Sequence, residues 1–350
     1  MTGPSYAFVD LCRAALEMCA VKEGETVAVL SQGDMRGDYA TAFMAASQKL
    51  GATPYHVRLP DASSGLDGDF GTWTVGATPL ASNRPVVELL KEADVLIDLM
   101  FLLFSAEQME IQAADTRILL CIEPLDLLAR LFPLKEIRER VEVGAELLAN
   151  ARSLRFTNEA GTDVTYDLGR YPVITQYGHT DEPGRWDHWP SGFVFTGGAD
   201  DGVNGTVVIA PGDILLPQKS YVRTPIRLTI EHGRIADIRG DVDADLMRDY
   251  MAGFNDERAY GIAHIGWGLD HRARWSALAT DTRGMGMEVR SFYGNVLFST
   301  GPNGELGGDN DTACHVDIPM RNCSLYLDDT PIVVDGDIVV NEMRATAGAR

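Results

Sequence analysis

The sequence is poor in basic residues and has no long apolar run. Of its 350 residues, 30 are lysine or arginine and 51 are aspartate or glutamate, so the formal net charge is −21. An acidic surface repels phosphate groups, which argues against nucleic acid and anionic membranes as partners. The longest apolar run, residues 95–104, is interrupted by Asp98 and is shorter than the roughly 18 residues of a spanning helix. We therefore expect neither partner and no membrane span.

Cysteine is scarce, and its spacing is irregular. The five cysteines form no Cys-x-x-Cys pair, which argues against a disulfide framework and against a thiolate zinc site. Cys12 and Cys19 are expected to be small buried apolar residues on one helix face. The first residues show no basic segment followed by an apolar one, as a secretory signal would. These features predict a cytoplasmic protein.

Two nucleotide-binding motifs are missing as well. The turn that follows the first predicted strand, Ser31-Gln32-Gly33-Asp34-Met35-Arg36-Gly37, does not have the G-x-G-x-x-G spacing. No G-x-x-x-x-G-K-[ST] sequence occurs anywhere in the chain. Since both motifs use glycines to bring the backbone close to phosphates, a nucleotide cofactor is not expected.

The composition is that of a globular protein, and the chain divides into two predicted domains. With 45% hydrophobic and 23% charged residues, the length corresponds to about two domains. Residues 1–152 alternate helical and apolar strand patterns, with strands at 26–30, 54–58, 94–99 and 117–122 and a long amphipathic helix at 135–152. This alternation predicts an α/β domain with a mostly parallel sheet, whose ligands lie at the carboxyl ends of the strands.

Residues 153–350 have a different character. Segments 154–157 and 164–167 read as a hairpin, segments 206–209, 227–231 and 234–238 as further strands, and 243–254 as a helix. This half is predicted to be an α+β domain. The stretch 61–71, rich in Gly and Asp, is expected to be either a mobile loop or a contact between subunits.

The first cluster of residues that could take part in binding or catalysis is Asp181-Glu182-Pro183-Gly184-Arg185-Trp186-Asp187-His188-Trp189-Pro190-Ser191-Gly192. Proline and glycine on both sides predict a loop, and loops often carry ligands. Indole faces suit stacking on a flat ring, and a histidine such as His188 could move a proton near neutral pH. The alternative is a structural aromatic corner around a hydrogen-bonded histidine.

The second cluster is divided between distant segments. Because residues two apart share one face of a strand, His315 and Asp317 are predicted to point into one site. His264, flanked by small residues, would complete a histidine–carboxylate set of the kind that holds iron(II) or zinc. Ser299 ends a strand where a hydroxyl can face a cavity. A hydrogen-bonded core histidine and an ordinary turn serine are the alternatives for His264 and Ser299.

These segments resemble two known families. Ala263-His264-Ile265-Gly266-x-Gly268 and the stretch from His315 to Arg321 are similar to the metal-binding segments of metallopeptidase family M29, the thermophilic aminopeptidases. A closer resemblance, over nearly the whole chain, is to the 2,5-dihydroxypyridine 5,6-dioxygenases of bacterial nicotinate degradation. It is carried above all by the string from Asp181 to Gly192, and also by Tyr260 to Gly268, Phe292 to Asn303 and His315 to Asn322.

The second resemblance implies a fold like that of the thermophilic aminopeptidases and a single non-haem iron(II). It implies His264, Ser299 and Asp317 as ligands, His315 at or next to the metal, and His188 as the base near the substrate. The reaction would be O2-dependent, extradiol-type opening of the bond between ring carbons 5 and 6, giving N-formylmaleamate. A homo-oligomer is expected from the same resemblance. Substrate-binding residues would be Arg185, Trp186, Trp189 and Phe104.

Three other interpretations remain open at this point. Phe104 stands where the family has a histidine, which leaves open another hydroxypyridine as substrate. A metalloaminopeptidase would need further carboxylates for a second metal, whereas residues 285–290 offer Glu288 alone and the His264 segment offers none before Asp270. A small-molecule binder that has kept the fold without catalysis is the third.

Overall fold

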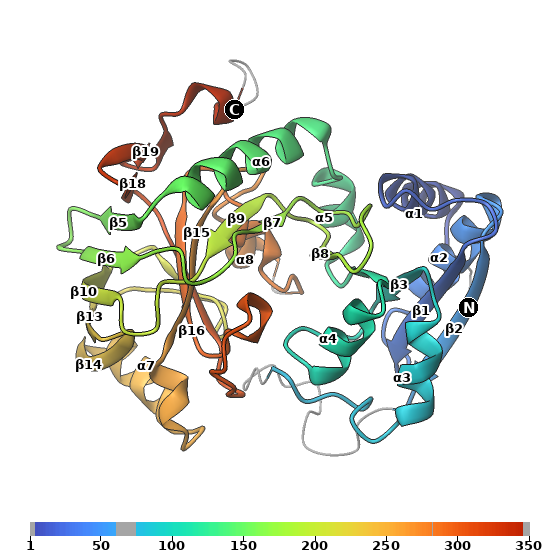
Figure 1. Cartoon of the computed structure of the whole chain (residues 1–350), viewed down its shortest axis with the longest axis horizontal. Helices are drawn as coiled ribbons and strands as arrows, with labels where there is room; N and C mark the ends of the chain where they lie inside the picture. Colours follow the sequence, from blue (N-terminus) through green and yellow to red (C-terminus); the bar gives the residue numbers. More distant parts are fainter. Residues whose placement is uncertain (1–3, 61–74, 282, 346–350) are drawn as a thin grey trace. The chain divides into compact units, whose positions relative to one another are not determined.

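The computed structural model describes residues 4–60, 75–281 and 283–345, which group into two compact units. Unit 1 comprises Met1–Phe70, Gly76–Pro133 and Tyr177–Ser191, and unit 2 comprises Gly71–Val75, Leu134–Gln176 and Gly192–Arg350. The chain thus returns to unit 1 after it has entered unit 2 (Figure 1). The domain boundary at residue 152 stays a prediction, and the stretch 61–71 lies outside the described residues.

Unit 1 is built on a parallel sheet, as the sequence predicts. Among its described residues, the strands follow the order β2-β1-β3-β4-β8, and each neighbouring pair is parallel. Their bounds are β1 (Thr26–Gln32), β2 (Thr53–Leu59), β3 (Val95–Asp98), β4 (Arg117–Leu120) and β8 (Trp186–His188). The four predicted strands are confirmed, with bounds shifted by up to two residues.

Strand β8 corrects the prediction that residues 181–192 are a loop throughout. Trp186 pairs with Ile118 and His188 pairs with Leu120 of β4. A strand of three residues between Gly184 and Pro190 has too few positions for an apolar period of two, so only its pairing reveals it.

Helices cover both faces of this sheet because β1 is apolar on both sides. Val27 and Val29 pack with the buried residues of α1 (Tyr6–Met18) and α2 (Gly37–Lys49). Ala28 and Leu30, which point the opposite way, pack with α3 (Arg84–Lys91) and α4 (Ala106–Ala113). A shorter helix, α5 (Leu125–Arg130), adds Leu128 to the first cluster. This two-sided burial is typical of parallel sheets.

Unit 2 holds mainly antiparallel strands. One sheet has the order β14-β13-β10-β6-β5-β18-β19-β20 within the described residues, and β11 pairs with β12. The strands are β5 (Ser153–Thr157), β6 (Asp163–Asp167), β10 (Val203–Ile209), β11 (Ile214–Leu215), β12 (Ser220–Tyr221), β13 (Ile226–Glu231), β14 (Arg234–Gly240), β18 (Ser324–Leu327), β19 (Thr330–Val334) and β20 (Asp337–Ile338). The predicted β5–β6 hairpin is confirmed by its antiparallel register.

The other large sheet of unit 2 has the order β17-β16-β15-β9-β7 within the described part of the chain. Its strands are β7 (Ile174–Gln176), β9 (Phe193–Thr196), β15 (Ile262–Gly268), β16 (Val296–Thr300) and β17 (Val316–Met320). The helices of unit 2 are α6 (Lys135–Asn150), α7 (Val242–Ala252), α8 (Ala277–Thr280) and α9 (Met287–Arg290), with 3-10 turns η1 (Glu257–Tyr260), η2 (Gly304–Leu306) and η3 (Asn341–Met343).

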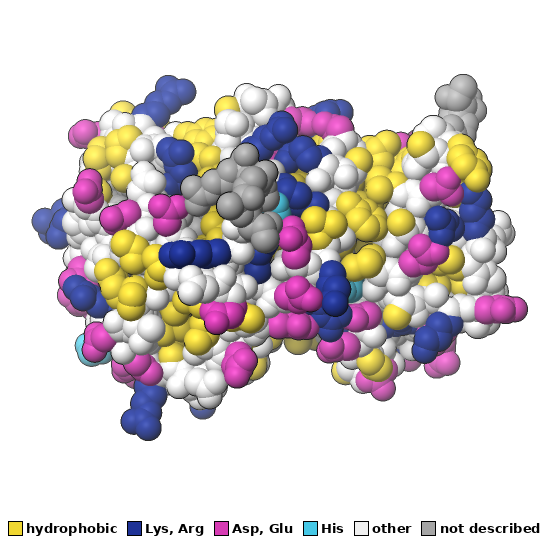
Figure 2. Space-filling view, turned by 90° about the horizontal axis from the view of Figure 1, so that it is seen from above, with side chains coloured by type: hydrophobic (Ala, Val, Ile, Leu, Met, Phe, Trp, Pro, Cys, Tyr) yellow, Lys and Arg dark blue, Asp and Glu magenta, His cyan; other side chains and the backbone are white. Residues whose placement is uncertain are grey.

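The surface fits the composition. Acidic and basic side chains are interspersed on the face shown in Figure 2, with hydrophobic groups in small patches between them. Among the described residues, no helix is both long and apolar enough to cross a bilayer. All five cysteines are buried, as expected for Cys12 and Cys19.

Candidate metal centre

Three neighbouring strands of unit 2 carry His264, Ser299 and Asp317 side by side. Ser299 of β16 lies directly opposite Asp317 of β17, so both side chains leave the same face of the sheet. On the other side of β16 the register slips between Ile262 and Ile265, so that two residues of β15 face Ser299. This irregularity is a β-bulge, which re-aims a side chain next to a site. It brings His264 into the same row.

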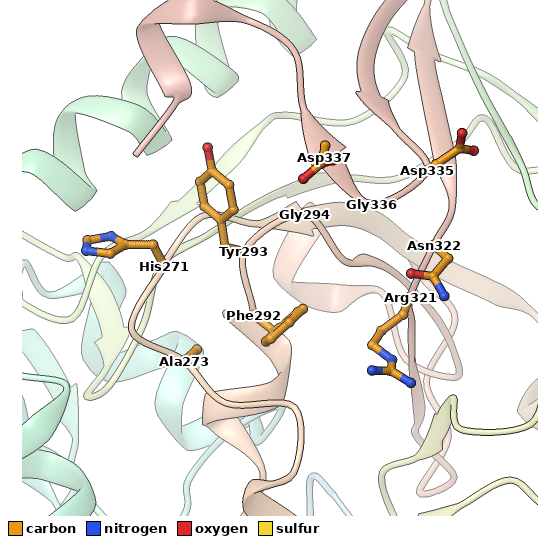
Figure 3. Close-up of a pocket in the computed structure, with 10 residues that line it drawn as sticks. All are labelled: His271, Ala273, Phe292, Tyr293, Gly294, Arg321, Asn322, Asp335, Gly336 and Asp337. Atoms are coloured by element: carbon orange, nitrogen blue, oxygen red, sulfur yellow. The ribbon is translucent and has the colours of Figure 1, made fainter. Parts of the chain in front are cut away.

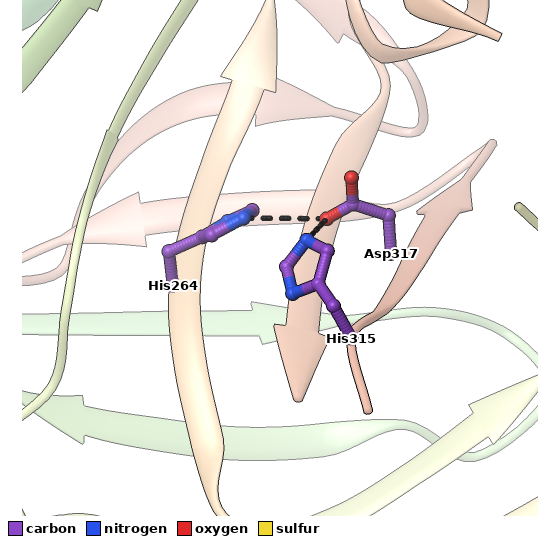
Figure 4. A group of neighbouring side chains, drawn as sticks. All are labelled: His264, His315 and Asp317. Carbon is purple, nitrogen blue, oxygen red and sulfur yellow. Dashed lines mark ion pairs between the residues drawn. The ribbon is translucent and has the colours of Figure 1, made fainter. Parts of the chain in front are cut away.

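His264, His315 and Asp317 form a compact group in which each side chain offers one ligand atom, and these atoms all lie within 4.8 Å of one another. Oδ1 of Asp317 is 3.2 Å from Nε2 of His264 and 3.3 Å from Nε2 of His315. Figure 4 shows both rings directed at this one oxygen. The group is largely shielded from solvent, with exposed fractions of 1% for His264, 9% for His315 and 4% for Asp317.

The hydrogen bonds of the two histidines indicate what this group can hold. Nδ1 of His315 donates to the carbonyl oxygen of Thr300 at 3.1 Å, which fixes the tautomer and leaves a lone pair on Nε2 in the neutral ring. Both ring nitrogens of His264 and Oδ1 of Asp317 are buried without a hydrogen-bond partner among the described residues. In its neutral form His315 therefore turns the lone pair of Nε2 toward Oδ1 of Asp317, 3.3 Å away, and two buried acceptors this close repel unless a cation lies between them. The donor set therefore fits a divalent metal.

The electrostatics favour the protonation states that a metal requires. Burial lowers the pKa of His264 to about 4, against the pull of Asp317, so its ring is neutral at pH 7. Burial by itself would raise the pKa of Asp317, but above all the charge of Arg290 holds it well below its usual value. A neutral imidazole and an ionised carboxylate are the forms that bind metals.

Ser299 is fully buried and makes a structural contact of its own. Its Oγ accepts the backbone N–H of His264 at 3.1 Å. Because the bulge removes His264 from the regular β15–β16 register, the hydroxyl takes the place of a ladder carbonyl. The predicted ligand thus also holds the strand in the conformation that presents His264.

The structure adds residues that no sequence pattern selects. Nε of Arg290, at the end of α9, lies 3.4 Å from Oδ2 of Asp317. Phe195 and Phe193 approach the ring of His264, with centroids 4.9 and 6.3 Å away. Burial raises the pKa of Glu305 to about 7, against the opposing charge of Arg290. No local motif signals these residues, because they come from three separate elements, α9, β9 and η2.

The predicted base and most of the predicted substrate residues belong to unit 1. His188 is 1% exposed, and its Nε2 lies 3.5 Å from Oγ of Ser191. Arg185 donates to Oδ2 of Asp187 at 3.0 Å, and its guanidinium lies 3.8 Å from the ring centroid of Tyr177. The ring of Trp186 is 5.6 Å from that of His188. Thus the specific string from Asp181 to Gly192 builds a dense aromatic and charged cluster around His188.

The two remaining residues of the predicted ring wall differ in exposure. Trp189 is 1% exposed, belongs to the core of unit 1, and donates from Nε1 to the carbonyl oxygen of Leu131. This burial gives no support to a substrate-wall role for Trp189. Phe104 is half-buried and has a positive φ of 64° in the loop after β3. Asp98 orders that loop by accepting three backbone N–H groups.

Unit 2 also contains a cavity of about 440 Å³ with a different lining (Figure 3). Phe292, Tyr293 and Arg321 contribute to its wall, together with Asp335 and Asp337. None of the residues of the His264–His315–Asp317 group lines it. Asp335 lies in the turn after β19, Asp337 begins β20 and Arg321 directly follows β17, and they are not among the groups of described residues that could hold a metal. We therefore place the candidate chemistry at the histidine–aspartate group.

Comparison with known proteins agrees with this geometry. The profile of 2,5-dihydroxypyridine 5,6-dioxygenase matches residues 7–340. The 2,5-dihydroxypyridine 5,6-dioxygenase of Pseudomonas putida is 47% identical over 331 residues, which cover 93% of this chain and 94% of that protein. The solved structure of 2,5-dihydroxypyridine dioxygenase from Pseudomonas putida matches with a TM-score of 0.92 at 45% identity, covering 96% of this chain and 98% of that one.

A more distant likeness concerns the fold alone. AmpT from Thermus thermophilus matches with a TM-score of 0.66 at 14% identity, covering 95% of this chain and 99% of that one. The fold and the site therefore define an α/β protein of the thermophilic aminopeptidase type with a histidine–aspartate centre. Within that class, the chain belongs to the 2,5-dihydroxypyridine 5,6-dioxygenase family. It is a dioxygenase, and the fold expected from the sequence is confirmed.

Proposed function

We propose that this chain uses one iron(II) to open the ring of 2,5-dihydroxypyridine with O2, giving N-formylmaleamate. The substrate and the 5,6-dioxygenation are those in the name of the Pseudomonas putida relative, whose match covers 93% of this chain. The single observation that supports the metal is that the Nε2 lone pair of neutral His315 faces Oδ1 of Asp317 at 3.3 Å, with Nε2 of His264 directed at the same oxygen. Both atoms of O2 enter the product, because the ring gains two oxygen atoms and loses none of its own.

We assign His264, Ser299 and Asp317 as the metal ligands, with His315 at or directly beside the metal. The histidine and carboxylate donors suit iron(II) or zinc, and we favour iron because zinc has no redox chemistry with which to activate O2. Bound iron supplies the electron transfer with which O2 is activated toward an electron-rich ring. Ser299 would bind the metal through one lone pair of Oγ, while the other lone pair accepts the backbone N–H of His264. His315 is held in one tautomer by Thr300.

His188 is our candidate for the general base that takes the proton from a substrate hydroxyl. An imidazole has a pKa near neutrality and is therefore suited to this step. Trp186 and Phe104, both partly exposed, are candidates for the walls on either side of a flat ring. Since Phe104 stands where a family histidine is expected, we propose to test other hydroxypyridines alongside 2,5-dihydroxypyridine.

An oxygen electrode tests the function directly. Protein that is reconstituted with iron(II) under anaerobic conditions should consume O2 when 2,5-dihydroxypyridine is added, and a chelator should abolish the uptake. No uptake with correctly metallated protein would refute this substrate while leaving the metal centre standing. Peptide turnover with two metals per chain would instead support an aminopeptidase.

Variants separate the metal ligands from the base. His264→Ala and Asp317→Ala should lose iron, whereas His188→Ala should retain iron and lose turnover. His56→Ala is a matched control in unit 1, since that exposed ring contacts Oγ of Ser31 at 2.8 Å. Normal turnover by His188→Ala would show that His188 is not the base.

A further inference from the structure

We propose that Arg290 occupies the position of a second cation and thereby limits the centre to one divalent metal. The inference rests on the proposed function, because it assumes that the group formed by His264, His315 and Asp317 binds a metal. Arg290 is 3% exposed, and its Nε is buried without a hydrogen-bond partner among the described residues. A full charge held in this way needs a countercharge close by.

The two oxygens of Asp317 face different cations. Oδ1 is directed at the two imidazoles, as Figure 4 shows, and a metal fits there. Oδ2 lies 3.4 Å from Nε of Arg290. In centres with two metals, the ions are about 3.5–4 Å apart, so a second ion sharing Asp317 would sit at Oδ2. There it would meet the guanidinium at contact distance.

Arg290 is held in this position from several sides. Its guanidinium lies 5.4 Å from the ring centroid of Phe193, and Nη1 contacts Sδ of Met287 at 3.9 Å. Phe193 and Met287 are both buried and neutral, so neither can replace Asp317 as the counterion of the guanidinium. The arginine is therefore a fixed part of the centre. A guanidinium is suited to this because it stays protonated at every physiological pH.

The carboxylates that could otherwise support a second metal are engaged elsewhere. Oε1 of Glu288 accepts the backbone N–H of Arg274 at 2.6 Å. Asp270 pairs with Arg272 at 2.8 Å. Glu305, which is half-buried, remains as a further carboxyl that interacts electrostatically with Arg290 and Asp317. Removal of the guanidinium charge would free Oδ2 of Asp317 and Glu305 for a second ion.

The experiment is a titration of metal-free protein with Co²⁺, with the bound metal counted by mass spectrometry and the sites followed by d–d absorption. The wild type should bind one Co²⁺ per chain. Arg290→Met, which keeps the length and loses the charge, should bind two, with the first at least about tenfold tighter because a neighbouring positive charge is gone. Arg290→Lys, which keeps the charge, should again bind one.

Controls keep the outcomes distinct. Arg272→Gln removes an arginine that pairs with Asp270 and should leave the stoichiometry at one. Adding Glu305→Gln to Arg290→Met should remove the second Co²⁺. One Co²⁺ in Arg290→Met at unchanged affinity, or weaker binding in a variant with a native circular dichroism spectrum, would overturn the inference. No binding by the wild type would refute the proposed metal centre itself.

Discussion

Replacing Ser299 by alanine tests whether the hydroxyl holds the strand that presents His264. The backbone N–H of His264 lies at the bulge, and its hydrogen bond goes to Oγ of Ser299 at 3.1 Å. Alanine leaves this buried donor unpaired, which costs about 1–3 kcal/mol. For a cooperative unit of roughly 200 residues, about 2 kcal/mol lowers the melting temperature by about 4–8 °C.

The assay should use protein stripped of metal, so that loss of a ligand does not contribute to the result. Urea titrations then compare Ser299→Ala with the wild type and with Ser276→Ala, whose exposed side chain makes no capping hydrogen bond. We expect a lower midpoint for Ser299→Ala alone. A wild-type midpoint would refute the reasoning, and iron affinity measured afterwards would then report the ligand role separately.

The other predictions concern protonation, packing and thiol reactivity. The pKa of His264 falls to about 4 on folding because of burial, so the unfolded chain takes up a proton first as the pH falls. The contribution of neutral His264 to the free energy of unfolding is therefore present above about pH 6.5 and is lost between about pH 6.5 and pH 4, a total of about 3 kcal/mol. Urea titrations of metal-free protein should show this decrease in the free energy of unfolding as the pH falls. The His264→Asn variant should lack it. Gly266→Ala should lower the urea midpoint strongly, because a Cβ would lie 2.0 Å from the carbonyl oxygen of Val194. Gly304→Ala is the control, because a Cβ there would have no atom within 4 Å. Equal midpoints for the two variants would contradict the prediction. Burial raises the pKa of every cysteine thiol, so Ellman's reagent should react with none of the five at pH 8 until the chain is unfolded, and a fast-reacting native thiol would disprove this.

Local patterns account for the elements that the sequence predicted well. The helix α6 and the strand β1 are confirmed because the first has an apolar helical period and the second is a continuous apolar run. The turn His232-Gly233, between the predicted strands 227–231 and 234–238, has positive φ at both residues, as a two-residue hairpin requires. In each case the determining interactions lie within a few residues of one another.

The candidate site was only partly accessible to such reasoning. Two residues apart, His315 and Asp317 share a strand face by geometry alone, and the structure places them together with His264. Ser299 entered through family resemblance, and nothing in its own segment distinguishes it from a turn serine. Strand β8 has only three residues, so it is identified by its pairing with β4 in the structure.

By itself, the sequence determined the kind of protein: an acidic α/β chain with a histidine–carboxylate set and the signature of a ring-cleaving dioxygenase family. Only the tertiary structure decided how that set is arranged. The bulge opposite Ser299 and the approach of Arg290 to Oδ2 of Asp317 join segments that are far apart in the chain. Such contacts depend on sheet register and on burial, which no local period encodes.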